Sequence, residues 1–397
     1  MIQTAKRIAR VDEYYFSRKL AEVRALDTQG RKVINLGIGS PDLAPTSNVI
    51  DALIDSARLP DTHGYQSYKG IPALRQAIAA FYRDTYGVSL NPEREILPLM
   101  GSKEGIMHIA MAFVDEGDEV LVPDPGYPTY SSVANLVGGK IRTYALNEQQ
   151  NWALDLDALR QQDLSRVKLM WVNFPHMPTG RVARAEELQE LVSLARQHHF
   201  LIVNDNPYSL ILNDSPLSLL SIPGAEEVAL ELNSLSKSHN MAGWRIGWVA
   251  GKPEFLDAIL RVKSNMDSGM FLGLQHAATE ALRHSRDWFN QLNDVYRGRK
   301  VVAHQILDEL DCQYALDQSG LFVWARVNER IAEVEKWVDE ILYGAHVFIT
   351  PGFIFGSKGA RHIRISLCSP VEQMKIALER IQEHQALVEK KIKVEVR

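Results

Sequence analysis

The chain has 397 residues, of which 46% are hydrophobic and 23% are charged, and this length suffices for a large domain with a smaller companion. The formal net charge of −5 argues against a broad basic surface, so nucleic acid is not an expected partner. No window approaches the roughly 20 apolar residues of a membrane helix, so we expect no membrane partner either.

Cysteine usage and the N-terminal residues favour a cytoplasmic protein. The two cysteines, Cys312 and Cys368, are too few for a disulfide framework and are expected to be buried thiols in a reducing compartment. Charged side chains interrupt residues 4–15, so no signal peptide is expected there. A cytoplasmic enzyme is therefore the leading class.

Short apolar runs alternate with helix-patterned segments through most of the chain. Before residue 46 we predict a helix and then the loop LGIGSPDLAP, and residues 184–198 have the apolar spacing of a helix. Continuous apolar strands separated by helices indicate a mostly parallel sheet that is covered on both faces. The predicted fold class is therefore α/β. The predicted strands of this sheet are residues 119–123, 167–174, 200–205, 228–235 and 246–250.

The two ends of the chain break this alternation. After about residue 275 a long helical pattern continues towards residue 310. It is followed by a pair of predicted strands, 320–327 and 362–367, with a helix at 331–342 between them. We expect both ends to meet in a small α+β domain. The predicted division is an N-terminal arm and part of the small domain (1–46), a large domain (47–285) and a C-terminal small domain (286–397).

Polar residues gather where the predicted strands stop, and in an open parallel sheet the ligand site lies beyond the carboxyl ends of the strands. Polar side chains gathered at one edge of a sheet lose water at a cost in free energy unless a bound polar ligand replaces it. Taken singly, Asp205 is equally well explained as a turn or capping residue, whereas Tyr208 is better explained as an aromatic residue at the rim and Lys237 as a solvated surface lysine. Their joint arrangement favours a site. The set is Asn173, Asp205, Tyr208, Ser234, Ser236 and Lys237.

A second feature suits an anion. The stretch GSKEG, residues 101–105, opens a predicted helix whose free backbone N–H groups and dipole attract negative charge. Arg245 and nearby serine hydroxyls add donors that suit a phosphate. A serine-capped helix explains the stretch equally well by itself, and the lack of a GxxxxGK[ST] motif argues against a nucleotide P-loop.

The stretch SLSKSHNMAGWRIGW, residues 234–248, resembles the lysine signature of class I/II, fold-type I aminotransferases, which use pyridoxal 5′-phosphate. Further motifs of that family occur in the family's order, so the resemblance covers nearly the whole chain. They are LGIGSPD, YQSYKG, GSKEG, PGYPTY, NFPHMPTG, NDNPYS and RHIRISL.

The resemblance implies a role for each matching residue near the cofactor ring. Lys237 matches the lysine that forms the aldimine, and Asp205 matches the carboxylate that faces the pyridine nitrogen. Tyr208 and Asn173 match the pair that binds the ring oxygen, and Asn173 also lies beside the substrate. Tyr127 matches the aromatic residue that stacks on the ring.

The resemblance also implies residues for the charged groups of cofactor and substrate. Arg364 matches the arginine that binds the substrate α-carboxylate, with Gly39 close to it, whereas Arg361 is expected to be a strand-surface residue. Tyr65 matches a tyrosine that reaches the phosphate of the neighbouring subunit, which implies a homodimer. No metal ion is expected. The implied phosphate-binding residues are Ser102, Lys103, Ser234, Ser236 and Arg245.

The implied activity is ping-pong transfer of an amino group between an L-amino acid and a 2-oxo acid. The sequence departs from the family pattern at His176 and Met177, which is expected to alter loop packing. Residues 261–271 do not clearly show the arginine of dicarboxylate-specific members, so the chain looks closer to members that act on diaminopimelate, alanine or other neutral amino acids. Specificity is expected to depend on residues around 12–20, 38–44 and 261–271.

Three other functions are alternatives to this one. A carbon–sulfur β-lyase, or another fold-type I pyridoxal enzyme, would share these residues, and only its products distinguish it. An effector-binding module of a regulator needs an attached DNA-binding domain, for which the arm before residue 46 is too short and not basic enough. An NAD-dependent dehydrogenase needs a GxGxxG after the first strand, which is absent.

Overall fold

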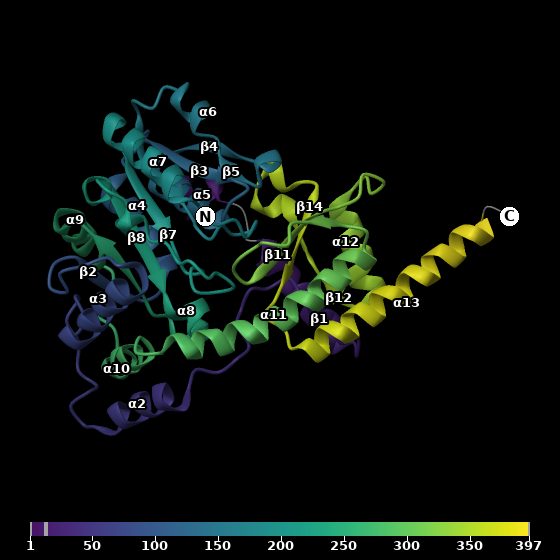
Figure 1. Ribbon diagram of the computed structural model, residues 1–397, viewed down its shortest axis with the longest axis horizontal. Coiled ribbons are helices and arrows are strands. Elements are labelled where there is room, and N and C mark those ends of the chain that lie inside the picture. Colours follow the sequence, from purple (N-terminus) through teal and green to yellow (C-terminus); the bar gives the residue numbers. More distant parts are fainter. Residues whose placement is uncertain (1, 12–14, 396–397) are drawn as a thin grey trace.

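The computed structural model describes residues 2–11 and 15–395. Its large domain is built on an eight-stranded sheet with the order β2-β9-β8-β7-β6-β3-β4-β5 (Figure 1). The neighbours β4, β3, β6, β7 and β8 are parallel, and β2, β9 and β5 join in antiparallel fashion. This confirms the mostly parallel α/β sheet. The strands are β2 (Ile96–Leu99), β3 (Glu119–Asp124), β4 (Lys140–Asn147), β5 (Ala153–Leu154), β6 (Val167–Val172), β7 (Leu201–Asp205), β8 (Ala229–Ser234) and β9 (Gly247–Gly251).

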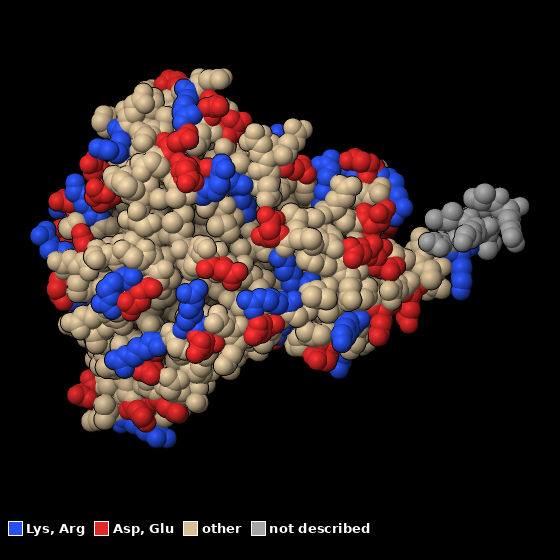
Figure 2. All heavy atoms as spheres, viewed as in Figure 1, with Lys and Arg blue, Asp and Glu red and all other residues tan. Residues whose placement is uncertain are grey.

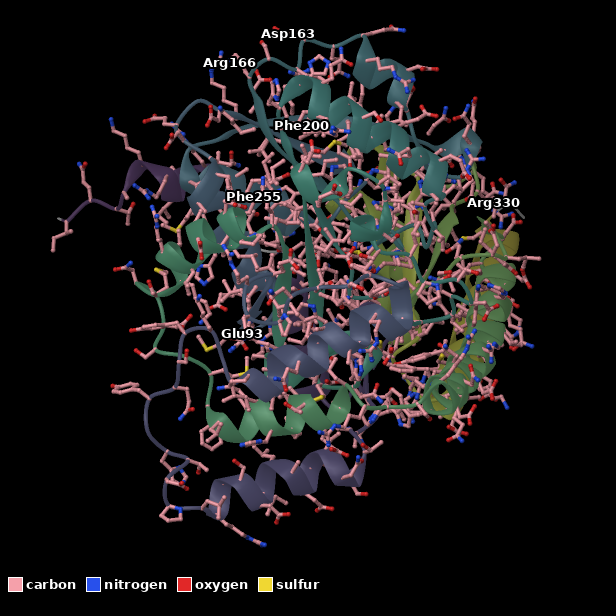
Figure 3. The ribbon with its side chains drawn as sticks, turned by 60° about the vertical axis from the view of Figure 1, so that its left-hand side comes forward. Glu93, Asp163, Arg166, Phe200, Phe255 and Arg330 are labelled. Atoms are coloured by element: carbon pink, nitrogen blue, oxygen red, sulfur yellow. The ribbon has the colours of Figure 1, made fainter. Side chains whose placement is uncertain are left out.

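Helices cover both faces of this sheet because alternate residues of its strands point to opposite sides. In β6, Leu169 and Trp171 belong to one buried apolar cluster, and Met170 and Val172 belong to another. Figure 3 shows side chains filling this interior, where Phe200 lies, whereas Asp163 and Arg330 lie at the outside. The helices of this part are α2 (Ser47–Arg58), α3 (Pro72–Tyr86), α4 (Ser102–Phe113), α5 (Pro128–Val137), α6 (Leu156–Arg160), α7 (Ala185–His198), α8 (Leu235–Ser238), α9 (Pro253–Lys263) and α10 (Leu272–Ala281).

The ends of the chain meet beside the large sheet. A four-stranded antiparallel sheet has the order β10-β11-β14-β13, and β1 pairs in parallel with β12. Lys19 of α1 lies 2.7 Å from Asp339 of α12, so the N-terminal helix packs on the C-terminal part. The division at residues 46 and 285 stays a prediction. The elements are α1 (Tyr15–Thr28), β1 (Ile34–Asn35), α11 (Arg286–Glu309), β10 (Gln313–Tyr314), β11 (Phe322–Arg326), α12 (Val334–Ala345), β12 (Val347–Phe348), β13 (Thr350–Pro351), β14 (His362–Ser366) and α13 (Val371–Glu395).

Several predicted elements differ from the observed ones. The single helical pattern from residue 275 to 310 is two helices, because Ser285 caps α11 by accepting a hydrogen bond from the Trp288 amide at 3.3 Å. The strand predicted at 228–235 ends at Ser234, whose hydroxyl caps α8. The helix predicted at 331–342 begins and ends three residues later. The predicted strands of the large sheet do not include β2, β4 or β5.

The distribution of charge and the polarity of the helices can be followed in the structure. Figure 2 shows acidic and basic side chains interspersed over the visible face of the molecule. Within residues 2–11 and 15–395, each helix is too short or too polar to cross a membrane.

Candidate active site

A cavity of about 570 Å³ lies beyond the carboxyl ends of the central strands, and residues of α1 and β14 form part of its lining. Its lining brings together segments from the whole length of the chain. Among the residues predicted from sequence, those that line it are Gly39, Ser102, Lys103, Tyr127, Asn173, Tyr208, Ser234, Ser236, Lys237, Arg245 and Arg364.

Asp205 lies at the end of β7 and is only 5% exposed. Its Oδ2 accepts a hydrogen bond from the Tyr130 hydroxyl at 2.9 Å, whereas its Oδ1 is buried without a hydrogen-bond partner. Burial raises the pKa of Asp205 to about 6, because desolvation disfavours the carboxylate. A buried carboxylate oxygen without a donor suits a ligand that presents an N–H group.

Lys237 lies on the short helix α8, directly after β8. Its Nζ donates a hydrogen bond to the carbonyl oxygen of Gly39. Burial lowers the pKa of Lys237, and the nearby charges of Arg364 and Arg245 act in the same direction. A lysine of this kind loses its proton more readily and is therefore a nucleophile and a base.

Hydroxyl and guanidinium donors surround the N-terminus of α4. Ser234 Oγ donates to Ser236 Oγ at 2.8 Å, and Arg245 Nη1 donates to the same Ser236 oxygen at 3.4 Å. Gly101 precedes Ser102 with a φ of +92°, and a Cβ built on it would lie 2.2 Å from Arg245 Nη2. Backbone N–H groups, two hydroxyls and a guanidinium thus form a site for a phosphate.

Three further polar residues line the cavity. The Asn173 amide nitrogen donates to the backbone oxygen of Asp205, and its Oδ1 accepts from the Met177 amide at 2.8 Å. The side chain of Asn173 is therefore held by backbone groups. Burial raises the pKa values of Tyr208 and Tyr127 above their ordinary range, so both hydroxyls remain protonated donors.

Arg364 lies in the middle of β14 and is only 4% exposed. Its Nη2 donates to the Gly37 carbonyl oxygen at 2.7 Å, and its guanidinium lies over the Phe322 ring, 3.8 Å from the centroid. Arg361 instead donates to the backbone oxygen of Asn328 at 2.8 Å and does not line the cavity. Of these two arginines, Arg364 lines the cavity, whereas Arg361 precedes β14 and is partly buried rather than on the strand surface.

Some residues singled out from the sequence lie elsewhere. Tyr65 is 94% exposed and lies outside this cavity. Residues 261–271 do not line it, and residues 12–14 lie outside the described part of the chain.

Tyr130 was not predicted, although it lies within the motif PGYPTY, three residues after Tyr127. The sequence also did not single out the aromatic residues Phe16, Phe322 and Phe355 at the opposite wall, for which it offers no signal beyond ordinary core patterning.

A separate polar group lies away from the cavity. Glu104, His108 and Asp267 each place one potential metal ligand atom within 4.8 Å of the others. Lys263 Nζ lies 2.8 Å from Asp267 Oδ1 and already balances that carboxylate. The absence of a required metal stays a prediction.

Comparison with known proteins places this geometry in a family. Residues 31–381 match the family described as "Aminotransferase class I and II". The chain is a member of this family. The aminotransferase is 39% identical over 385 residues to LL-diaminopimelate aminotransferases of Dehalococcoides mccartyi and Moorella thermoacetica, with 96% of this chain and 98% of each relative covered. It therefore depends on pyridoxal 5′-phosphate and transfers amino groups between amino acids and 2-oxo acids.

Solved structures agree with this assignment. The aminotransferase superposes on apo-BacF of Bacillus subtilis with a TM-score of 0.92 and 33% identity, covering 96% of this chain and 98% of that one. It superposes on a single mutant of Thermus thermophilus aspartate aminotransferase with a TM-score of 0.90 and 27% identity, covering 97% and 100%. These neighbours confirm fold type I, and the comparisons do not favour a β-lyase.

Proposed function

We propose that Lys237 is the catalytic lysine of this aminotransferase and that the cavity around it binds pyridoxal 5′-phosphate and the amino acid. The observation that carries the proposal is that Lys237, a lysine of lowered pKa, lines the cavity directly after β8, while the neighbouring strand β7 ends at Asp205, whose Oδ1 is buried without a partner. The bound cofactor supplies an electron sink for bond breaking at the substrate Cα.

The chain's own residues hold the cofactor at both ends. Asp205 Oδ1, which is buried without a partner, would accept a hydrogen bond from a protonated ring nitrogen and so hold that proton in place. Tyr208 and Asn173 would bind the ring oxygen, and Tyr127 would cover the ring face; all three line the cavity. The phosphate-binding residues are Ser102, Lys103, Ser234, Ser236 and Arg245.

The substrate is positioned from the opposite wall. Arg364 binds the α-carboxylate through its planar fork, which matches a carboxylate better than a lysine does, and Gly39 borders the same space. Lys237, once its amine is neutral, takes the proton from Cα and delivers it to the cofactor side, acting first as a base and then as an acid. Its contact with the Gly39 carbonyl keeps the amine at this point.

The test of this function is product analysis. The purified enzyme is incubated with single L-amino acids and a 2-oxo acid, and the new 2-oxo acid and new amino acid are quantified. LL-diaminopimelate belongs in the panel because the relatives bear that name. Equal amounts of both products support transamination, whereas pyruvate and ammonia would indicate a β-lyase. A Lys237→Ala variant with near-normal turnover would contradict the assignment of Lys237.

A homodimer with shared sites belongs to the same proposal. Tyr65 is a large aromatic residue that is 94% exposed and lies outside its own chain's cavity, which is consistent with a place in a partner's site. Mixing Lys237→Ala chains with Tyr65→Ala chains tests it, because a mixed dimer regains one intact site only if Tyr65 acts across the interface. Recovered activity is expected, and no recovery from chains that exchange would mean that Tyr65 acts within its own subunit.

A cytoplasmic location completes the proposal. Both cysteines are free thiols in buried positions, which is compatible with a reducing compartment. Fractionation of the source cells tests the location.

A further inference from the structure

One short loop contacts both cationic residues of the proposed site. The loop, residues 37–42, lies between β1 and α2, and we call it the carbonyl loop. Its Gly39 carbonyl oxygen accepts a hydrogen bond from Lys237 Nζ, and its Gly37 carbonyl oxygen accepts one from Arg364 Nη2 at 2.7 Å. The position of the carbonyl loop therefore affects both the proposed catalytic lysine and the proposed substrate-binding arginine.

The N-terminal end of the carbonyl loop is held by uncharged side chains. Asn35 Oδ1 accepts a hydrogen bond from the Gly37 amide at 3.0 Å, and Thr350 Oγ1 donates one to the Gly37 carbonyl oxygen at 2.9 Å. The space around the loop is small, because a Cβ built on Gly39 would lie 2.2 Å from Cζ of Phe322. Hydrogen bonds and close packing thus fix this end of the loop.

The other end of the carbonyl loop is held by an ion pair. Asp42 Oδ1 and Oδ2 lie 2.6 and 2.8 Å from Nη1 and Nη2 of Arg299, so the pair is bidentate. Arg299 is only 3% exposed and belongs to α11, which follows α10 in the chain and packs on α13 (Figure 1). Removal of Asp42 would leave this buried guanidinium without its carboxylate, which is unfavourable.

Arg299 also contacts the end of the strand that carries Arg364. Its Nη1 donates a hydrogen bond to the carbonyl oxygen of Leu367 at 3.0 Å, directly after β14. The Ser366 amide in turn donates to the carbonyl oxygen of Leu36 at 2.7 Å, so β14 lies beside the start of the loop. A single planar guanidinium therefore ties the far end of the carbonyl loop to the end of β14.

We infer that Asp42 and Arg299 are positioning residues for the reaction. Their ion pair holds the carbonyl loop so that the proposed catalytic lysine and the substrate-binding arginine keep the relative position that the substrate needs. The inference rests on the proposed function, which gives Lys237 and Arg364 these roles. Neither Asp42 nor Arg299 lines the cavity, so the pair acts through the loop and not by touching the substrate.

Binding of a simple carboxylate is the first test, because it does not require turnover. The probe is propionate, which has a carboxylate but no amino group, and its Kd for the holoenzyme is measured by calorimetry. Asp42→Asn keeps the shape of the side chain and removes its charge. Because small displacements of a binding group are costly, we expect the propionate Kd to rise by about tenfold. An unchanged propionate Kd overturns the inference.

Kinetics and cofactor binding distinguish positioning from general stability. In Asp42→Asn the KM for the amino donor should rise by about tenfold with a smaller change in kcat. The cofactor Kd of the apoprotein should stay nearly unchanged, because the phosphate site and Asp205 lie outside the carbonyl loop. A cofactor Kd that rises as much as the propionate Kd overturns the inference, since the effect is then not confined to the substrate side.

Arg299→Lys tests the pair even where Asp42→Asn is unstable, because it keeps a positive charge and removes only the planar fork. We expect the same rise of about tenfold in the propionate Kd. The double variant should lose no more than the larger single loss, because both changes remove one interaction. Losses that multiply to about 100-fold would show that the two residues act separately, and this would overturn the pair.

Glu119→Gln is the matched control. Glu119 pairs with Arg142 at 2.5 Å, but it begins β3 and so lies at the opposite edge of the sheet from the cavity. Its replacement should leave the propionate Kd unchanged. Equal rises in Glu119→Gln and Asp42→Asn would show a general structural effect and overturn the inference.

Arg364→Lys separates a failure of this inference from a failure of the proposed function. If Arg364→Lys raises the propionate Kd and Asp42→Asn does not, only the positioning role is wrong. If Arg364→Lys leaves the propionate Kd unchanged, the proposed substrate site is wrong and the positioning role fails with it. The expected result is a raised Kd in both variants.

Discussion

The hydroxyl of Tyr130 donates a hydrogen bond to Oδ2 of Asp205 at a distance of 2.9 Å. The Tyr130 ring is itself fixed, since it stacks on Trp171 with the ring centres 5.0 Å apart and the planes 2° from parallel. One carboxylate oxygen is therefore occupied and oriented by the protein, and the other remains buried without a partner. This contact makes Tyr130 a positioning residue for Asp205.

Replacement of Tyr130 by phenylalanine keeps the stacked ring and removes only the hydrogen bond. Because a hydrogen bond to a charged group contributes about 1.5–3 kcal/mol, we expect cofactor affinity to fall by roughly tenfold or more. The same bond lowers the pKa of Asp205, so the pH at which Asp205 loses its proton should rise. Spectroscopic titration with the cofactor, repeated across pH, measures both effects.

The control for this variant is Tyr82→Phe. Tyr82 is fully buried but does not line the cavity, so its replacement should leave the cofactor Kd and its pH dependence unchanged. Similar shifts in both variants would mean that Tyr130 acts only through general packing.

Asp205 should make the stability of the apoprotein depend on pH. Its folded-state pKa is raised from 3.8 to about 6, so between these values the folded state binds the proton and the unfolded state does not. The contribution of Asp205 to the free energy of unfolding is therefore largest below pH 4 and is lost as the pH rises through 6. Relative to Asp205→Asn, the wild-type free energy of unfolding should fall by up to about 3 kcal/mol between pH 4 and pH 7. Urea unfolding of both apoproteins measures this difference, and a difference that does not change with pH would contradict it.

Arg364→Lys should weaken substrate binding while sparing the cofactor. A lysine cannot reproduce the planar fork, so we expect kcat/KM to fall by about 10- to 100-fold, mainly through KM. Arg361→Lys is the matched control, since Arg361 bonds backbone oxygens away from the cavity. Steady-state kinetics of both variants measure this effect. Comparable losses of kcat/KM in the two variants would contradict the proposed contact between Arg364 and the substrate.

Gly101→Ala should disturb the phosphate site specifically. The added Cβ would lie 2.2 Å from Arg245 Nη2, so the guanidinium must move and cofactor affinity should fall. Gly30→Ala is the control: Gly30 also has a positive φ, +80°, but nothing lies within 4 Å of its Cβ position. Both variants should lose stability on the order of 1 kcal/mol from backbone strain, and only Gly101→Ala should raise the cofactor Kd. A raised cofactor Kd in both variants would show that backbone strain, and not displacement of Arg245, causes the effect.

The sequence by itself indicated the parallel sheet and most of the polar site. Asp205, Ser234 and Lys237 could be found because each directly follows an apolar run, and such runs place their carboxyl ends at one edge of a parallel sheet. The order of the motifs then indicated the family. These features are local, since a strand pattern and the residues just after it are read within a few positions.

Only the tertiary structure decided which distant faces meet. Phe16 and Arg364 come from opposite ends of the chain, yet the Arg364 guanidinium carbon lies 5.7 Å from the Phe16 ring centre, because α1 packs against the C-terminal part. Apolar periodicity shows that a face is buried but does not specify its partner. The meeting of Phe16 with Arg364, and the contact between Tyr130 and Asp205, therefore follow from packing alone.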